Sequence, residues 1–124
     1  MKKKILVVDD SRFIFEEMKY KMRLCDRYEI AYYCPDGESL PEVYEKCNPD
    51  LVTIDIVMPG IDGIEATRRL LQKHPEARVI VVTSLVFDDT IEEAEKAGAL
   101  GLLAKPFETE QMIQDFDAAF SKRP

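Results

Sequence analysis

Short apolar runs alternate along this chain with longer stretches in which apolar residues repeat at helical spacing. Most runs consist of Val, Ile and Leu with little polar alternation, as expected for strands that are covered on both faces. The runs predict strands at residues 5–8, 28–34, 51–55, 79–82 and 100–104. Alternating strands and helices with short connections favour a parallel five-stranded sheet, joined by right-handed crossovers, with helices on both faces. The predicted fold class is therefore α/β, a doubly wound (βα)5 sheet.

Length, charge and cysteine pattern limit the classes of protein to which the chain can belong. Its 124 residues predict a single domain, residues 1–124, with a core of its own. No apolar run is long enough to span a membrane and the basic start carries no cleavage site, so we expect a cytoplasmic protein without membrane contact. The net charge of -7 disfavours direct nucleic-acid binding. Cys25, Cys34 and Cys47 lack metal-type spacing, which favours reduced thiols without a ligand role.

Polar side chains follow four of the five predicted strands. They are Asp9 and Asp10 after the first strand, Asp55 at the end of the third, Thr83 after the fourth and Lys105 after the fifth. The carboxyl ends of parallel strands meet at one edge of a sheet, where open α/β folds bind their ligands, so these side chains are predicted to share one pocket. Two simpler roles remain open: Asp55 alone could cap a turn, and Asp10 or Ser11 could cap the following helix.

This set of side chains suits phosphoryl transfer, a reaction in which positioning and electrostatics dominate. Three carboxylates can hold a divalent cation, and oxygen ligands beside a phosphate favour Mg²⁺. Asp55 can then act as a nucleophile that forms an aspartyl phosphate. Thr83 and Lys105 are predicted to bind the phosphoryl oxygens through a hydroxyl and an ammonium group.

The residues around these positions resemble the receiver domain of two-component response regulators. The resemblance rests on Val-Val-Asp9-Asp10-Ser, on Asp55-Ile-Val-Met58-Pro59-Gly60-Ile-Asp62-Gly63, on Val-Val-Thr83-Ser84 and on Lys105-Pro106-Phe107. Each motif alone is weakly specific, but together they are specific in their order and spacing, and they extend over essentially the whole chain. The resemblance implies the flavodoxin-like, CheY-like strand order 2-1-3-4-5.

For the site, the resemblance implies that Asp55 is the phosphoacceptor and becomes a 4-aspartylphosphate. It also implies that Asp10 and Asp55 bind Mg²⁺ directly and that Asp9 acts through water. The backbone carbonyl of Val57 would supply a further metal ligand. A receiver of this kind is not an enzyme, but a phosphoacceptor that assists its own phosphorylation and dephosphorylation.

The resemblance further implies that Thr83 and Lys105 bind the phosphoryl group. It also implies that the peptide bond between Lys105 and Pro106 is cis, as is usual in the family. The phosphoryl donor would be a sensor histidine kinase, a histidine phosphotransfer protein or a small acyl phosphate. Output to a partner protein would pass through the fourth helix, fifth strand and fifth helix, with the chain a monomer or a weak dimer on phosphorylation. We favour a stand-alone regulator over a receiver cut from a longer protein with a separate output domain.

Two departures from the family pattern affect the expected switch and the expected lifetime of the phosphoryl group. The fifth-strand position that is usually Tyr or Phe is Leu102, so an aromatic switch is absent there. Phe87 is the candidate substitute, with local packing or a partner contact as the alternative. Val57 and Leu85, each two residues beyond a site residue, are aliphatic and cannot hydrogen-bond an attacking water. We therefore expect slow self-dephosphorylation.

Other classes of protein fit the residues less well. A phosphatase of the haloacid dehalogenase type needs a second Asp two residues after the nucleophile, where Val57 stands, and a cap domain that does not fit in 124 residues. A flavodoxin-like flavin carrier needs hydroxyls and amides after its first strand, where Asp9 and Asp10 would repel a phosphate. A receiver used only for interaction is disfavoured because the set of site residues is complete.

Overall fold

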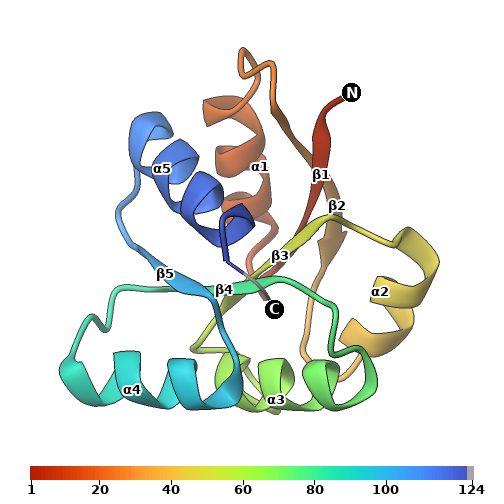
Figure 1. Ribbon diagram of the computed structural model, residues 1–124, viewed down its shortest axis with the longest axis vertical. Helices are drawn as coiled ribbons and strands as arrows, with labels where there is room; N and C mark the ends of the chain where they lie inside the picture. Colours follow the sequence, from red (N-terminus) through yellow and green to blue (C-terminus); the bar gives the residue numbers. More distant parts are fainter. Residues whose placement is uncertain (123–124) are drawn as a thin grey trace.

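A computed structural model describes residues 1–122 and confirms the predicted α/β class (Figure 1). The strands are β1 (Lys3–Val8), β2 (Tyr28–Cys34), β3 (Leu51–Asp55), β4 (Val79–Thr83) and β5 (Gly101–Ala104). The helices are α1 (Arg12–Lys21), α2 (Leu40–Cys47), α3 (Gly63–Lys73), α4 (Asp88–Ala97) and α5 (Thr109–Phe120). Within the described part of the chain, no helix combines the length and the apolar character needed to cross a membrane.

The five strands pair in parallel in the order β2-β1-β3-β4-β5, which confirms the order implied by the resemblance. β3 lies at the centre of the sheet between β1 and β4, and β5 forms one edge. All five strands point the same way, so their carboxyl ends share one edge of the sheet. This arrangement brings together residues that are far apart in the sequence.

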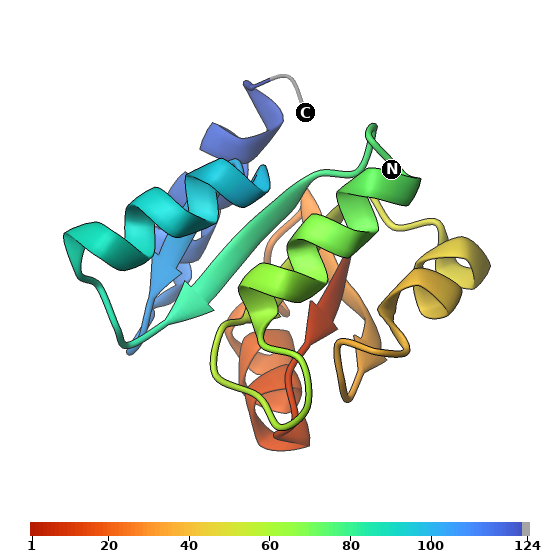
Figure 2. The same cartoon turned by 90° about the horizontal axis from the view of Figure 1, so that it is seen from below.

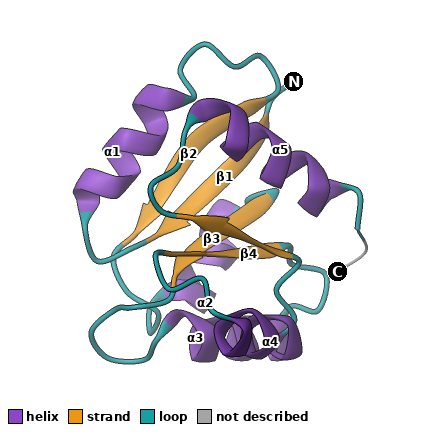
Figure 3. Cartoon of the chain, turned by 90° about the vertical axis from the view of Figure 1, so that its left-hand side faces the viewer, coloured by secondary structure: helices purple, strands orange, loops and turns teal. Residues whose placement is uncertain are grey.

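Helices cover both faces of the sheet (Figures 2 and 3): α1 and α5 lie on one face, and α2, α3 and α4 lie on the other. Alternate residues of β1 serve the two faces. Ile5 and Val7 belong to the core beneath α1 and α5, whereas Leu6 and Val8 pack against α2 and α3. Because both faces are covered, consecutive positions of a strand must be apolar, which explains the continuous apolar runs in the sequence.

Local residues explain several helix ends. Asp62 caps α3 by accepting a hydrogen bond from the amide of Glu65 at 2.8 Å. Gly98 ends α4 in the left-handed conformation, with a φ of 105° that glycine adopts readily. The capping role considered for Asp10 or Ser11 is wrong: Ser11 stands at the start of α1, but no side chain caps the helix there.

Candidate functional site

The predicted site residues converge at the edge of the sheet where the strands end. Asp55 is the last residue of β3 and Thr83 the last of β4, while Asp9 and Lys105 directly follow β1 and β5. The Nζ atom of Lys105 lies 3.5 Å from Asp55 Oδ1 and 3.6 Å from Asp9 Oδ2. One ammonium group therefore faces two carboxylates from different strands. The peptide bond between Lys105 and Pro106 is cis, as the resemblance implied.

Asp9, Asp10 and Asp55 form an acidic cluster in which one carboxylate oxygen of each residue lies within 4.8 Å of the others. Asp9 and Asp55 are buried, whereas Asp10 is exposed. Burial raises the pKa of Asp9 and of Asp55 above the usual carboxyl value, and the charge of Lys105 opposes that rise. Crowded carboxylates of this kind favour a cation between them. The oxygen-only donor set fits a hard divalent cation such as Mg²⁺.

Neighbouring polar groups act on the two buried carboxylates. Asp9 Oδ1 accepts from the amide of Ser11 at 2.8 Å, and the Tyr33 hydroxyl donates to the Asp9 carbonyl at 2.8 Å. The nearby amide of Val57 lowers the pKa of Asp55, against the larger effect of burial.

Thr83 is buried next to Asp55, because β3 and β4 are neighbouring strands. Its Oγ1 accepts a hydrogen bond from the amide of Leu85 at 2.9 Å. A hydroxyl can accept and donate at the same time, so this contact leaves the hydrogen of Thr83 available to a ligand. The geometry therefore allows the role predicted for Thr83.

The aliphatic residues that follow Asp55 and Thr83 are accessible to solvent: Val57 is 62% exposed and Leu85 is 40% exposed. Leu102 is partly buried and packs against the core cluster that includes residues of β4, α3 and α4. Phe87 is 65% exposed at the start of α4. The structure therefore groups neither Leu102 nor Phe87 with the charged residues of the site.

The loop after β3 is held by Glu38, a residue that the sequence analysis did not single out. Glu38 precedes α2, and its Oε2 accepts a hydrogen bond from the amide of Ile61 at 3.2 Å. Beside it, Gly60 has a φ of 79°, and a Cβ atom there would collide with the carboxylate of Glu38. No spacing or motif near Glu38 in the sequence indicates this contact with a loop that lies more than twenty residues further along the chain.

Comparisons with known proteins agree with this geometry. The family model of the response regulator receiver domain matches residues 5–117 of this chain. The chain is 39% identical over 108 residues to the chemotaxis protein CheY of Halobacterium salinarum, covering 87% of this chain and 88% of that protein. It is 33% identical over 110 residues to the transcriptional regulatory protein DegU of Brevibacillus brevis, covering 89% of this chain but 47% of DegU. This chain therefore spans about half the length of that relative. The CheX-CheY-BeF3-Mg+2 complex from Borrelia burgdorferi superposes with a TM-score of 0.86 at 28% identity, covering 97% of this chain and 90% of that one.

Proposed function

Because this chain belongs to the receiver domain family of two-component response regulators, we propose that it accepts a phosphoryl group on Asp55 and thereby changes its affinity for a partner protein. The observation that supports this best is the position of Lys105 Nζ, 3.5 Å from the Asp55 carboxylate and beside a cluster of three acids. An acid, an ammonium group and a hydroxyl from different strands meet where a phosphoryl group needs charge and hydrogen-bond donors.

In the proposed reaction, a carboxylate oxygen of Asp55 attacks the phosphorus of a phosphohistidine or an acyl phosphate. The new O–P bond forms as the P–N or P–O bond of the donor breaks, and the leaving group keeps that electron pair. Lys105 can contact the transferred phosphoryl oxygens while it remains close to Asp55. Thr83 can donate its hydroxyl hydrogen to another of these oxygens, because its acceptor side is already occupied by the amide of Leu85.

The clustered aspartates are the residues that would hold Mg²⁺. We propose that Asp10 and Asp55 bind it directly, that Asp9 acts through water and that the Val57 carbonyl is a further ligand. The support is the oxygen-only donor set, with carboxylate oxygens within 4.8 Å of one another. Bound Mg²⁺ would supply positive charge that offsets both the carboxylates and the phosphoryl oxygens.

The proposal extends to partners and to the place of action. The donor is a sensor histidine kinase or a histidine phosphotransfer protein in the cytoplasm, and output passes through the surface of α4, β5 and α5. The chain acts as a phosphoacceptor and not as an enzyme that turns over a substrate, because its product is its own modified side chain. It is a monomer, or a weak dimer once phosphorylated.

Intact-mass measurement after incubation with acetyl phosphate tests this function. We expect one added phosphoryl group in the presence of Mg²⁺, and none without Mg²⁺ or in the variant Asp55→Asn. Asp50→Asn is the matched control, because Asp50 directly precedes the other end of β3, where its carboxylate accepts from the Lys4 amide at 2.7 Å. Unchanged phosphorylation of Asp55→Asn would overturn the assignment of Asp55. A wild-type protein that stays unmodified with both acetyl phosphate and phosphorylated histidine donors would overturn the function.

The alternative classes are not favoured by the geometry. Val57, which stands where a haloacid dehalogenase-type phosphatase needs its second acid, is an exposed aliphatic residue. A flavin phosphate would meet the acidic cluster of Asp9 and Asp10 at the end of β1.

A further inference from the structure

Lys21, the last residue of α1, contacts the loop between β5 and α5 (residues 105–108) and the start of α5. Its Nζ atom donates a hydrogen bond to the Phe107 carbonyl at 2.6 Å and lies 5.1 Å from the centre of the Phe107 ring. Its own backbone carbonyl accepts a hydrogen bond from the hydroxyl of Thr109, the first residue of α5, at 2.8 Å. Side chain and backbone of one residue thus connect α1 to both the loop and the helix that follows it.

Two carboxylates hold the ammonium group of Lys21 in this position. Glu17 Oε2, one turn earlier in α1, lies 3.1 Å from Nζ, and Glu108 Oε1 of the loop lies 3.3 Å from it. The Lys21 side chain is only 20% exposed. Because water screens a partly buried ammonium group less than one on the open surface, its hydrogen bond to the Phe107 carbonyl is a firm anchor for the loop.

The anchored loop begins with Lys105, whose Nζ lies 3.5 Å from Asp55 Oδ1. The Lys105 amide donates to the Thr83 carbonyl at 2.9 Å, which fixes the loop where it leaves the sheet. Two residues later the loop is fixed again, because the Phe107 side chain is buried in the core and the Phe107 carbonyl is bonded by Lys21. The direction in which the Lys105 side chain projects therefore depends on both anchors.

Packing alone does not fix the loop between these anchors. A groove of about 280 Å³ lies between α1 and the loop, and Lys105, Pro106 and Phe107 line its loop side. The groove leaves room for the loop to shift if the bond from Lys21 is removed. A displacement of about 1 Å in a group that acts on a reaction can lower its rate by about a hundredfold.

We propose that Lys21 is a positioning residue for the phosphorylation of Asp55. Its bond to the Phe107 carbonyl holds the β5–α5 loop so that the ammonium group of Lys105 faces the carboxylate that reacts. This inference rests on the proposed function, because it concerns the rate of that reaction. The simpler role, a salt bridge that only adds stability, predicts that loss of the ammonium group lowers the melting temperature without a specific loss of rate.

The rate of phosphorylation by acetyl phosphate, followed by intact mass, tests the proposal. Lys21→Met removes the ammonium group and keeps an unbranched apolar side chain beside the Phe107 ring. We expect the maximal rate to fall about fivefold or more. The Mg²⁺ concentration that gives half of this rate should change less than about twofold, because the aspartates are untouched. An unchanged maximal rate would overturn the proposal.

Two further variants of α1 serve as controls for the loss of charge. Lys19→Met makes the same change of net charge at an exposed position of the same helix, where Nζ lies over the Phe15 ring and not beside the loop. Its rate should stay within about twofold of the wild-type rate, and a loss equal to that of Lys21→Met would overturn the proposal. Lys21→Arg keeps a donor for the carbonyl and should retain most of the rate. An Arg variant as slow as the Met variant would also count against the positioning role.

A double-mutant cycle separates positioning from a general loss of stability. If Lys21 acts through Lys105, then Lys21→Met should slow the reaction less than about twofold in a protein that already carries Lys105→Met. Thermal melts confirm that each variant is folded at the assay temperature. Equal losses of rate in the two backgrounds would show that Lys21 acts by another route and would overturn the proposal.

The wild-type protein separates this inference from the proposed function. Phosphorylation of wild-type Asp55 at the same rate as in Lys21→Met would remove the role of Lys21 and leave the receiver function intact. A wild type that neither acetyl phosphate nor a phosphorylated histidine donor modifies would overturn both.

Discussion

Val57 and Leu85 follow the reacting groups Asp55 and Thr83 closely, and neither can hydrogen-bond a water molecule. Both are exposed enough to accept polar replacements. We predict that Val57→Asn combined with Leu85→Glu shortens the lifetime of the phosphoryl group at least about tenfold, because the new polar groups would orient the attacking water. Time courses of phosphate release measure this lifetime. The control is Val86→Asn, an exposed neighbour in the same loop, and a wild type that decays as fast as the double variant would contradict the prediction.

Thr53 offers a second prediction at the scale of one residue. It is buried in the central strand, and its Oγ1 has no hydrogen-bond partner among residues 1–122. Thr53→Val removes an unpaired hydroxyl at almost constant shape, so the free energy of unfolding should rise by about 1 kcal/mol. Thr67→Val is the matched control: Thr67 is also buried, but its Oγ1 donates to the Gly63 carbonyl at 2.7 Å. Urea denaturation should show opposite signs for the two variants, and a loss of stability in Thr53→Val would contradict the explanation.

At the scale of elements, Asp117 of α5 connects this helix to β2 through hydrogen bonds. Its carboxylate accepts hydrogen bonds from the Tyr28 hydroxyl and, at 2.8 Å, from Arg27. These contacts lower the pKa of Asp117, the bond from Tyr28 most of all. The unfolded chain therefore binds the proton more readily than the folded chain does. The stabilisation is complete above the usual carboxyl pKa and is lost as the pH falls through the lower folded value.

We predict that Tyr28→Phe lowers the free energy of unfolding by about 1 kcal/mol at neutral pH. This value is smaller than that expected for a buried hydrogen bond to a charged group, because the side chain of Asp117 is 42% exposed and water screens its charge. The difference between variant and wild type should shrink as the pH falls below the usual carboxyl range. Denaturation at a series of pH values measures this difference. The control is Tyr20→Phe, because Tyr20 is an exposed residue of α1. A difference that stays constant on acidification would show that lost packing, and not the carboxylate contact, is the cause.

The elements themselves could be predicted because their determinants are local. In β3, Val52 and Ile54 face one side of the sheet and Leu51 faces the other. Because helices cover both sides, the strand is apolar at consecutive positions, and this pattern can be recognised without knowing which elements pack against it. The convergence of Asp55 and Lys105 was also predictable, because parallel topology alone places strand ends together. Burial within a helix was harder: Phe15 is buried and Phe13 is exposed, although both are aromatic residues of α1.

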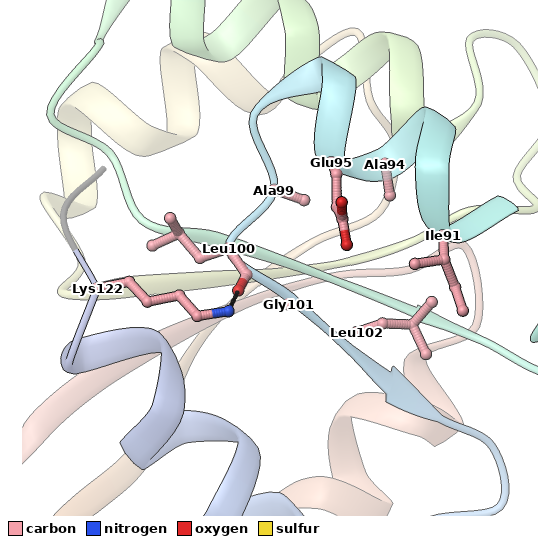
Figure 4. Close-up of a pocket in the computed structure, with 8 residues that line it drawn as sticks. All are labelled: Ile91, Ala94, Glu95, Ala99, Leu100, Gly101, Leu102 and Lys122. Atoms are coloured by element: carbon pink, nitrogen blue, oxygen red, sulfur yellow. Dashed lines mark hydrogen bonds between the residues drawn. The ribbon is translucent and has the colours of Figure 1, made fainter. Parts of the chain in front are cut away.

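Contacts between distant side chains could not be predicted from the sequence. The hydrogen bond of Glu38 to Ile61 joins two loops, and that of Tyr28 to Asp117 joins the second strand to the last helix. The pocket that Leu102 of β5 lines together with Ile91 and Ala94 of α4 likewise depends on how α4 packs against the edge of the sheet (Figure 4). Each of these features needs the relative position of two elements to within a few ångströms, and no spacing in the sequence carries that information.

The molecule as a whole concentrates negative charge where its strands end, and this costs stability that a cation can restore. Asp9 and Asp55 are buried beside exposed Asp10, and one ammonium group, that of Lys105, lies within ion-pair distance of the two buried acids. An unfolded chain does not hold the three carboxylates together, so a cation that binds them stabilises only the folded state. At a Mg²⁺ concentration roughly a hundred times Kd, the gain would be about 2.7 kcal/mol.

We therefore predict that Mg²⁺ raises the melting temperature of the wild-type protein by several degrees, since about 1 kcal/mol corresponds to roughly 3–5 °C for a domain of this size. Thermal melts with Mg²⁺ or with a chelator measure the shift. Asp50→Asn, which changes an acid directly before the opposite end of β3, should keep the full shift, whereas Asp55→Asn should lose most of it. A shift of equal size in both variants would place the cation elsewhere on this acidic chain, and the cluster at the strand ends would then lack its predicted ligand.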